Sequence, residues 1–393
     1  MGRIFYFSAL CAIPVCLLAS SVPAPAAQTF EIPAVLPITG GFSFLGQGEK
    51  KALQIEEKAV NQQGGVGGDH IRFSFHDDQS SPQIAVQLTS QINAGHPSVM
   101  IGSAIVAMCN AMAPLVAKGP VTYCLSPGIH PKAGSFVFTS FISTRDLARA
   151  LVAYFRNRGV TRLAMITSTD ASGQDGAAGF NRAMKLPENK KLTMAASVRF
   201  APSDISVSAQ IEQIKAAHAQ ALIVWTSGAP FGTVLKGIEL GGLEIPVGTT
   251  DANMTYAQMR QYASFMPSEM LFMSSEWPPH GTNLKLPAGV DRAQAAMFGA
   301  YKVEGVKPDI SSSLAWDPGM LEIDALRELG LKATAEKIRA YIAGQKHWAG
   351  INGVYNFAKR PQRGLDVSDS VVTRWQKDEK TWTIVSHPGG APL

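Results

Sequence analysis

Apolar positions along this chain follow two alternating spacings. Short apolar runs, rich in β-branched and aromatic residues, are separated by segments of about 10–16 residues in which apolar side chains recur at helical spacing. Within 146–158, Leu147, Leu151, Tyr154 and Phe155 fall on one helical face, the stripe that a helix presents to a sheet. The apolar runs predict strands at residues 29–38, 71–75, 99–101, 121–125, 163–167, 192–200, 221–226, 246–249 and 270–274.

Helices are expected between these strands, and the alternation determines the fold class. The helical segments are residues 47–62, 83–94, 106–117, 146–158, 176–184, 206–217, 232–240 and 256–263. Strands that alternate with helices form parallel sheets from right-handed strand–helix–strand units. The last third differs, with helices at 291–303, 312–329 and 333–342 before a strand pair at 370–376 and 382–385. The sequence therefore predicts an α/β protein.

Residues 1–26 predict export. Arg3 precedes an apolar run, and the small residues Ala24 and Ala26 mark a cleavage site. The apolar run is shorter than the roughly 20 residues of a membrane-spanning helix, which disfavours a membrane anchor. We therefore expect a signal peptide at 1–26 and a soluble periplasmic mature chain, long enough for two domains.

The charge distribution indicates whether a nucleic-acid partner is expected, and the cysteines indicate whether a disulfide can form. The formal net charge is +5, but the charged side chains are scattered without a basic stripe, so no nucleic-acid partner is expected. Cys109 and Cys124 remain after removal of the signal peptide, in an oxidising compartment. Both would lie toward one edge of a sheet, either as a disulfide or as two buried thiols.

The most specific motif lies at residues 61–85, which read NQQGGVGGDHIRFSFHDDQSSPQIA. A helix leads into the glycine cluster at 64–68, a strand follows, and Asp77 and Asp78 end that strand before Pro82 starts the next helix. A dinucleotide-binding loop needs the opposite order, strand before glycines and helix after, which excludes that cofactor. The residues and their spacing closely resemble those of the amino-acid-binding family of periplasmic solute-binding proteins, whose best-known member is the leucine/isoleucine/valine-binding protein.

This resemblance covers nearly the whole mature chain, since it continues through residues 315–317, 350–357 and Gly364. It implies the type I periplasmic binding protein, or Venus-flytrap, fold: two doubly wound parallel-sheet lobes joined by three hinge crossovers. Lobe 1 would hold residues 27–139 and 275–353, and lobe 2 residues 140–274 and 354–393. The expected crossings lie near Thr139, Ser274 and Val354.

Candidate ligand contacts follow from the strand order. Ligands of open parallel sheets bind beyond the carboxyl ends of the strands, here in the loops at 39–46, 102–107, 126–130, 169–173, 226–231 and 249–253. The resemblance implies the same loops, with a ligand carboxylate held by the first lobe and the second lobe closing over it. The candidate ligand-binding residues are Phe44, Leu45, Ala104, Val106, Ala107, Gly128, Ile129, His130, Ser172, Gly228, Phe231, Thr250 and Asp251.

Several of these positions depart from the family's ligand contacts. Val106 stands where the family has a carboxylate-binding serine, although the amides of Val106 and Ala107 at a helix N-terminus still suit an anion. His130 stands at a carboxylate-binding threonine and is either a donor to the acid or a structural histidine. Ser172 precedes the loop glycine where the family has an aromatic residue, and Phe231 is either a replacement aromatic wall or part of the core.

Asp251 is the candidate partner of a ligand ammonium, and the alternative is that it caps a helix starting near Met254. The lost hydroxyls and gained apolar groups favour a ligand more apolar than a plain amino acid. We expect a small organic acid with an apolar or aromatic body, and next an apolar amino acid.

Motifs of common enzyme classes are missing from the sequence. It contains no His-Glu-x-x-His, no Gly-x-Ser-x-Gly, no phosphate loop and no paired Cys-x-x-Cys, so we expect no enzyme, no cofactor and no metal. A monomer is expected because no heptad pattern is present. A secreted hydrolase is disfavoured, since no nucleophile–base pair is visible.

Two functions remain, and both use lobes that close on a ligand. One is the solute-binding component of a branched-chain-amino-acid-type ABC importer, which delivers its ligand to an inner-membrane permease. The other is a periplasmic sensor subunit that signals to a membrane receptor.

Overall fold

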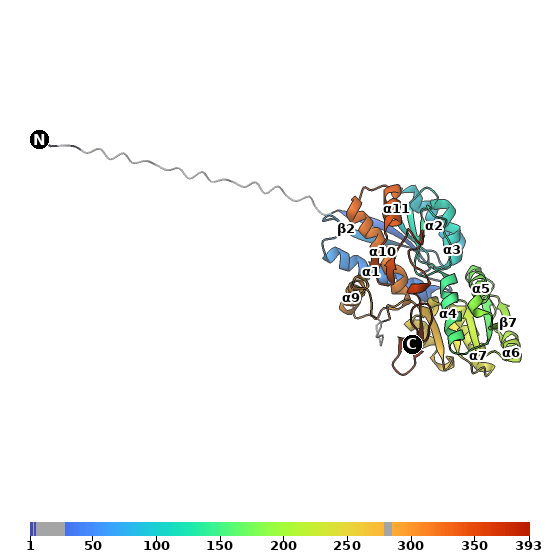
Figure 1. The fold of residues 1–393 in the computed structure, drawn as a ribbon. Coiled ribbons are helices and arrows are strands. Elements are labelled where there is room, and N and C mark those ends of the chain that lie inside the picture. The colour runs from blue at the N-terminus through green and yellow to red at the C-terminus, as the bar shows by residue number, and fades with distance from the viewer. Residues whose placement is uncertain (3, 5–27, 279–284) are drawn as a thin grey trace.

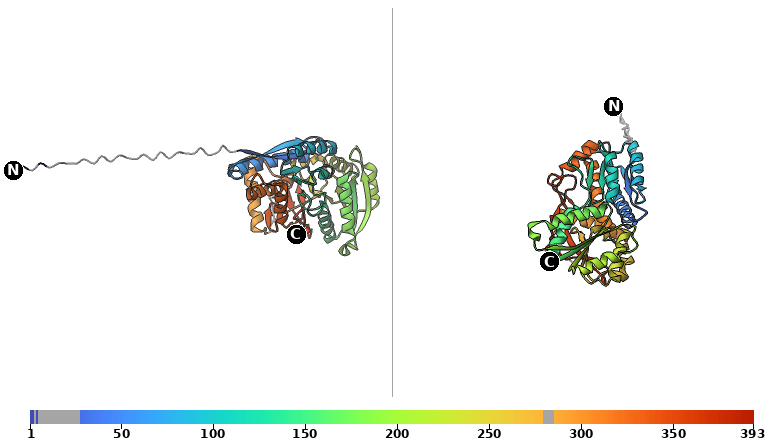
Figure 2. Two further views of the ribbon diagram at one scale, coloured as in Figure 1. Left: turned by 90° about the horizontal axis from the view of Figure 1, so that it is seen from above. Right: turned by 90° about the vertical axis from the view of Figure 1, so that its right-hand side faces the viewer.

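The structure, a computed structural model, describes residues 1–2, 4, 28–278 and 285–393, so the predicted signal peptide lies almost wholly outside the described residues. The strands form two large sheets with helices around each, which gives the chain two lobes (Figure 1). Figure 2 shows the two lobes from two further sides. Among the described residues, no helix combines the length and apolar character that crossing a membrane requires.

The first sheet is parallel throughout, in the order β2-β1-β3-β4-β5. Every residue of its central strands β3 and β4 is buried, as expected for a parallel sheet with helices on its faces. Its strands are β1 (Thr29–Leu36), β2 (His70–Asp77), β3 (Val99–Gly102), β4 (Val121–Cys124) and β5 (Val137–Thr139). Its helices are α1 (Ser43–Gln62), α2 (Pro82–Ala94), α3 (Val106–Met112), α9 (Ala288–Val303), α10 (Ile310–Leu329) and α11 (Ala335–Gly344).

The second sheet has the order β14-β13-β10-β9-β8-β6-β7, in which β13 and β14 are antiparallel and the others parallel. Its strands are β6 (Arg162–Ser168), β7 (Thr193–Phe200), β8 (Ala221–Trp225), β9 (Val247–Thr249), β10 (Met270–Ser274), β13 (Val371–Gln376) and β14 (Thr381–Ile384). Its helices are α4 (Thr144–Asn157), α5 (Ala171–Met184), α6 (Ser208–Ala216), α7 (Ala229–Leu240) and α8 (Tyr256–Gln261). Short 3-10 turns occur at Ala113–Val116, Pro187–Asn189, Asp251–Asn253, Ala263–Phe265 and Val367–Asp369.

The α/β class and the two lobes predicted from the sequence are confirmed, and the differences concern short elements. Strand β5 and the hairpin β11 (Trp348–Gly350) and β12 (Gly353–Tyr355) were not predicted. Each has three residues, too few for an alternation of apolar and polar side chains to be recognised. The helix expected at 106–117 is α-helical only to Met112 and continues as a 3-10 turn at Ala113–Val116, because Pro114 has no N–H to donate to the preceding turn.

We propose that the third crossover lies later in the chain than the expected position near Val354. The Phe357 ring packs on Phe138 with centroids 5.7 Å apart, and the amide of Thr139 donates to the Gln362 carbonyl at 2.9 Å. The chain thus stays beside the first sheet until Gln362 before it continues to β13, and Val354 lies within β12. We propose lobe boundaries near Thr139, Ser274 and Arg363.

Candidate functional site

Loops from the two lobes meet at the carboxyl ends of both sheets. The Ala229 amide at the start of α7 donates to the Gly41 carbonyl at 3.2 Å. Gly228 has a left-handed φ of 73°, and a Cβ there would lie 2.5 Å from that carbonyl oxygen. The close approach of the lobes therefore requires glycine at this candidate position.

His130 and Asp175 join the lobes a second time. The His130 Nε2 atom lies 2.7 Å from Asp175 Oδ1 on α5, and the His130 side chain is 30% exposed. The other carboxylate oxygen, Asp175 Oδ2, is buried and has no hydrogen-bond partner among the described residues. Sequence reasoning selected His130 but not Asp175, which lies beyond the loops at the strand ends.

The remaining first-lobe candidates form a mostly buried surface around Gly128. A Cβ on Gly128 would lie 2.6 Å from Val106 Cγ2 and 3.3 Å from Asp175 Oδ2. The amides of Val106 and Ala107, in the first turn of α3, have no acceptor within the helix, and no side chain caps that turn. Ala104 and Ile129 are buried beside these residues in the sequence.

A buried arginine lies behind this loop. Arg363 donates through Nη2 to the carbonyls of Pro127 at 3.1 Å and Ile129 at 2.6 Å. Through Nη1 it donates to the carbonyls of Ser140 and Phe141. It forms no ion pair with any described carboxylate, and burial lowers the pKa of Arg363 to about 10.

Arg363 was not among the predicted site residues. The available signal was its position directly before Gly364, the residue that supported the family resemblance. The pKa of about 10 keeps the guanidinium charged at neutral pH. The site thus contains a fixed positive charge that no described carboxylate pairs with directly, although Asp146 and Asp175 are near enough to stabilise it.

The second lobe supplies a buried carboxylate. Asp251 is fully buried, and its Oδ1 accepts a hydrogen bond from Thr250 Oγ1 at 2.7 Å while Oδ2 has no partner among the described residues. Burial raises the pKa of Asp251 to about 6. Thr250 caps the 3-10 turn at Asp251–Asn253 and Thr255 caps α8, so the alternative that Asp251 is a helix cap is wrong.

Other predicted residues lie further from these contacts or within the core. Phe231 is fully buried and packs on the Tyr262 ring, with centroids 6.0 Å apart. Leu45 is also buried in the core, whereas Phe44 is half-buried, with its ring centroid 6.4 Å from that of Tyr262. Ser172 is half-buried in the first turn of α5, which Asp170 caps.

A disulfide joins Cys109 and Cys124, whose Cα atoms are 6.1 Å apart. It connects α3 to the end of β4, and thus the two first-lobe loops that hold most of the candidate residues. No group of three or more His, Cys, Asp or Glu side chains suited to a metal was found in the part of the chain that the structure describes.

Solved structures of ligand-binding proteins share this fold. An extracellular ligand-binding receptor from Rhodopseudomonas palustris HaA2 has a TM-score of 0.80 at 19% identity, over 90% of this chain and 99% of that chain. An ABC transporter solute-binding protein from R. palustris in complex with benzoate has a TM-score of 0.77 at 18% identity, over 93% of this chain and 97% of that chain. A third structure is the substrate-binding protein LivJ of a branched-chain amino acid transporter from Streptococcus pneumoniae, in complex with isoleucine. Its TM-score is 0.74 at 16% identity, over 91% of this chain and 99% of that chain.

These identities are low, so the structural likeness concerns the fold. No curated protein matches this chain. A family model described as periplasmic binding protein matches residues 29–380, nearly all of the two lobes. The chain therefore belongs to the periplasmic binding protein family, with the type I fold.

Proposed function

We propose that this protein is the solute-binding component of an ABC importer and that it holds a small carboxylate-bearing ligand between its two lobes. The observation that carries the ligand class is the guanidinium of Arg363, which lies behind residues 127–130, donates to their carbonyls and forms no direct ion pair with a described carboxylate. Family membership and export, as predicted from residues 1–26, support a periplasmic role in solute uptake.

The guanidinium acts on two peptide units. Its hydrogen bonds to the Pro127 and Ile129 carbonyls polarise the peptide groups whose N–H belong to Gly128 and His130. Polarised amides beside the uncapped first turn of α3 favour an anion. In the proposal, the ligand carboxylate lies near Gly128, His130 and the amides of Val106 and Ala107.

Asp251 separates two ligand classes within this proposal. A buried carboxylate with one unpartnered oxygen suits the ammonium of an amino acid. A plain aromatic or aliphatic acid would offer it no partner. The neighbours with isoleucine and with benzoate are examples of the two classes in related folds.

Binding of acids and their neutral amides tests the anion subsite. Thermal shift with a panel of amino acids and aromatic acids identifies binders, and calorimetry then compares benzoate with benzamide and isoleucine with isoleucinamide. Replacing a carboxylate by an amide removes charge-assisted hydrogen bonds, so affinity should fall at least about tenfold. Equal affinity of acid and amide, or tight binding of a sugar or polyamine instead, would contradict the proposal.

Asp251→Asn decides between the classes. For an amino-acid ligand, loss of the buried counter-ion should weaken binding at least about a hundredfold. Wild-type affinity for that ligand should also fall as the pH drops below about 6, where Asp251 becomes protonated. For a plain acid, the substitution should be neutral or slightly favourable, because one negative charge leaves the site.

Delivery to an importer is tested in cells. Deletion of the gene should abolish high-affinity uptake of the radiolabelled ligand found in the panel, and plasmid-borne wild-type protein should restore it. Normal uptake with a lost transcriptional or motile response to the same ligand would favour the sensor function.

A further inference from the structure

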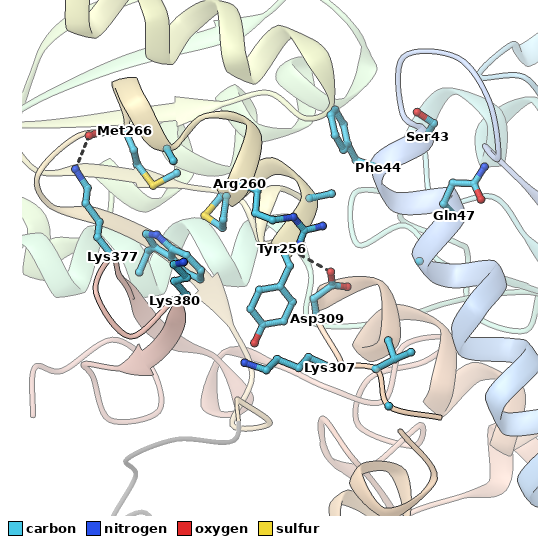
Figure 3. A pocket seen from close by; sticks show the side chains of 17 residues that line it. Ser43, Phe44, Gln47, Tyr256, Arg260, Met266, Lys307, Asp309, Lys377 and Lys380 are labelled. Atoms are coloured by element: carbon cyan, nitrogen blue, oxygen red, sulfur yellow. Dashed lines mark hydrogen bonds between the residues drawn. The ribbon is translucent and has the colours of Figure 1, made fainter. Parts of the chain in front are cut away.

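A groove separate from the candidate site crosses the boundary between the lobes (Figure 3). Its volume is about 1050 Å³. Of the predicted ligand-binding residues, only Phe44 lines it. We call it the rim groove. Its walls are formed by the first turns of α1, the segment before α10, helix α8 and the β13–β14 hairpin.

The floor of the rim groove is apolar and aromatic. The Tyr256 ring lies 6.3 Å from the Trp375 ring, centroid to centroid, and both residues line the groove. Met259 and Met266 extend this floor, and Val306, which is 38% exposed, belongs to the opposite lobe. A planar apolar body would bury surface against these side chains.

The walls of the groove carry an excess of positive charge. Its cationic side chains are Arg260, Lys307, Lys377 and Lys380, and none of them forms an ion pair within the described part of the chain. Figure 3 shows Arg260, Lys307 and Lys380 arranged around the Tyr256 ring. The Lys307 Nζ atom lies 5.9 Å from the centroid of that ring.

Asp309, the one acid among the described residues that line the groove, accepts hydrogen bonds from backbone amides. Its carboxylate caps α10 by accepting from the Ser311 amide at 3.1 Å and also accepts from the Tyr256 amide at 3.2 Å. Asp309 attracts Arg260 through space but forms no direct ion pair with it, so the four cationic side chains around the aromatic floor exceed the one nearby acid by three charges. Such an arrangement is unfavourable alone and becomes favourable when an anion is bound.

We propose that the rim groove is a second binding site, for an amphipathic anion with an aromatic body and at least two acidic groups. The aromatic body lies on Tyr256 and Trp375, and the acidic groups pair with Arg260 and Lys307 and with the hairpin lysines. The volume exceeds what an amino acid needs, which separates this ligand from the small acid of the interlobe site. Because both lobes contribute, the bound anion favours the arrangement in which they touch.

The disulfonated aromatic dye bis-ANS is a suitable probe. Titration of the mature protein, followed by fluorescence, should show one site in the micromolar range. The double variant Arg260→Gln/Lys307→Gln should weaken it at least about tenfold, since two charge-assisted contacts are lost. The matched control, Lys190→Gln/Lys332→Gln, removes the same charge from exposed positions outside the groove and should leave affinity within about twofold.

A third variant and a neutral dye complete the test. Val306→Glu adds an acid at a half-exposed position and should also weaken bis-ANS, with an unchanged melting temperature. Nile red, which has no charge, should bind the wild type and Arg260→Gln/Lys307→Gln alike. The proposal is overturned if bis-ANS finds no such site, if both double variants weaken it equally, or if neither does.

Discussion

At the residue scale, Asp317 shows how one side chain fixes a large part of the first lobe. Its carboxylate accepts hydrogen bonds from the amides of Ile351 at 2.7 Å and Asn352 at 3.0 Å. The Asn352 side chain and the Tyr355 hydroxyl also donate to it. Burial raises the pKa of Asp317 to about 6. This residue therefore ties α10 to the β11–β12 hairpin, which leads into the third crossover.

Asp317→Ala should destabilise the protein strongly. Two buried amides would lose their acceptor, at about 1–3 kcal/mol each, so unfolding in urea should show a loss of at least about 2 kcal/mol. Asp378→Ala, at an exposed turn position, is the control and should change the free energy of unfolding little. A small loss in both variants would contradict this role of Asp317.

A second prediction separates two roles of His130. If His130 donates to the ligand, His130→Ala should weaken binding about ten- to a hundredfold. Asp175→Asn alters only the partly exposed hydrogen bond between His130 and α5 and should cost no more than about fivefold. Calorimetry with the panel ligand measures both. Equal losses would show that His130 acts mainly through its pairing with Asp175.

At the element scale, the contact between α1 and α10 buries three glutamates. Glu49, Glu56 and Glu322 are fully buried, and their carboxyl oxygens have no hydrogen-bond partner among the described residues. Burial raises the pKa of each well above its ordinary value. The helices thus pack through carboxyl groups that favour the protonated form.

These groups predict a stability that falls as pH rises. Each raised pKa means that the folded state holds a proton which the unfolded state releases from about pH 4.5 upward. Stability is therefore fully present below that pH and is lost toward the folded pKa, by about 1.4 kcal/mol per pH unit for each titrating group. The melting temperature should be higher at pH 5 than at pH 8.

The double variant Glu56→Gln/Glu322→Gln tests the origin of this trend. It should flatten the fall in stability with rising pH, because neither amide titrates. Glu379→Gln, at an exposed turn position, should reproduce the wild-type curve. A wild-type slope in the double variant would mean that other groups cause the trend.

Elements with clear periodicity were predictable from the sequence, whereas these contacts were not. The apolar stripe of α4 and the glycine turn before β2 led directly to the observed elements. Glu49 and Glu56 are charged residues that a pattern places on a solvent face, yet tertiary packing buries them. Arg363 is far from the candidate loops in sequence and Asp175 lies just past the loop at 169–173; only the folded chain brings them to the segment 128–130.

At the scale of the whole molecule, the lobes touch at several separated points. Besides the Ala229–Gly41 and His130–Asp175 contacts, the Ile310 amide at the start of α10 donates to the Met254 carbonyl at 3.2 Å. The described arrangement is therefore one in which the lobes already meet. A ligand that contacts both lobes would stabilise it over more open arrangements.

Gly228→Val should separate the lobes. Its Cβ would lie 2.5 Å from the Gly41 carbonyl oxygen in the opposite lobe, so the radius of gyration in small-angle scattering should increase and ligand affinity fall. Gly242→Val is a matched control, because Gly242 also has a left-handed φ, of 59°, but nothing lies within 4 Å of its Cβ. An identical radius in both variants would exclude a steric role for Gly228. Ligand should also make the wild type more compact.

Arg363 has a mechanical consequence for the motion between lobes. The residue belongs to the third crossover, and its guanidinium holds the carbonyls of Ser140 and Phe141 in the first. Two of the three crossovers are thereby joined to each other by hydrogen bonds and should move together. Twisting of one lobe against the other would break these bonds, whereas rotation about a line through the fastened pair leaves them intact. Opening of the lobes should therefore be a rotation about a single hinge axis.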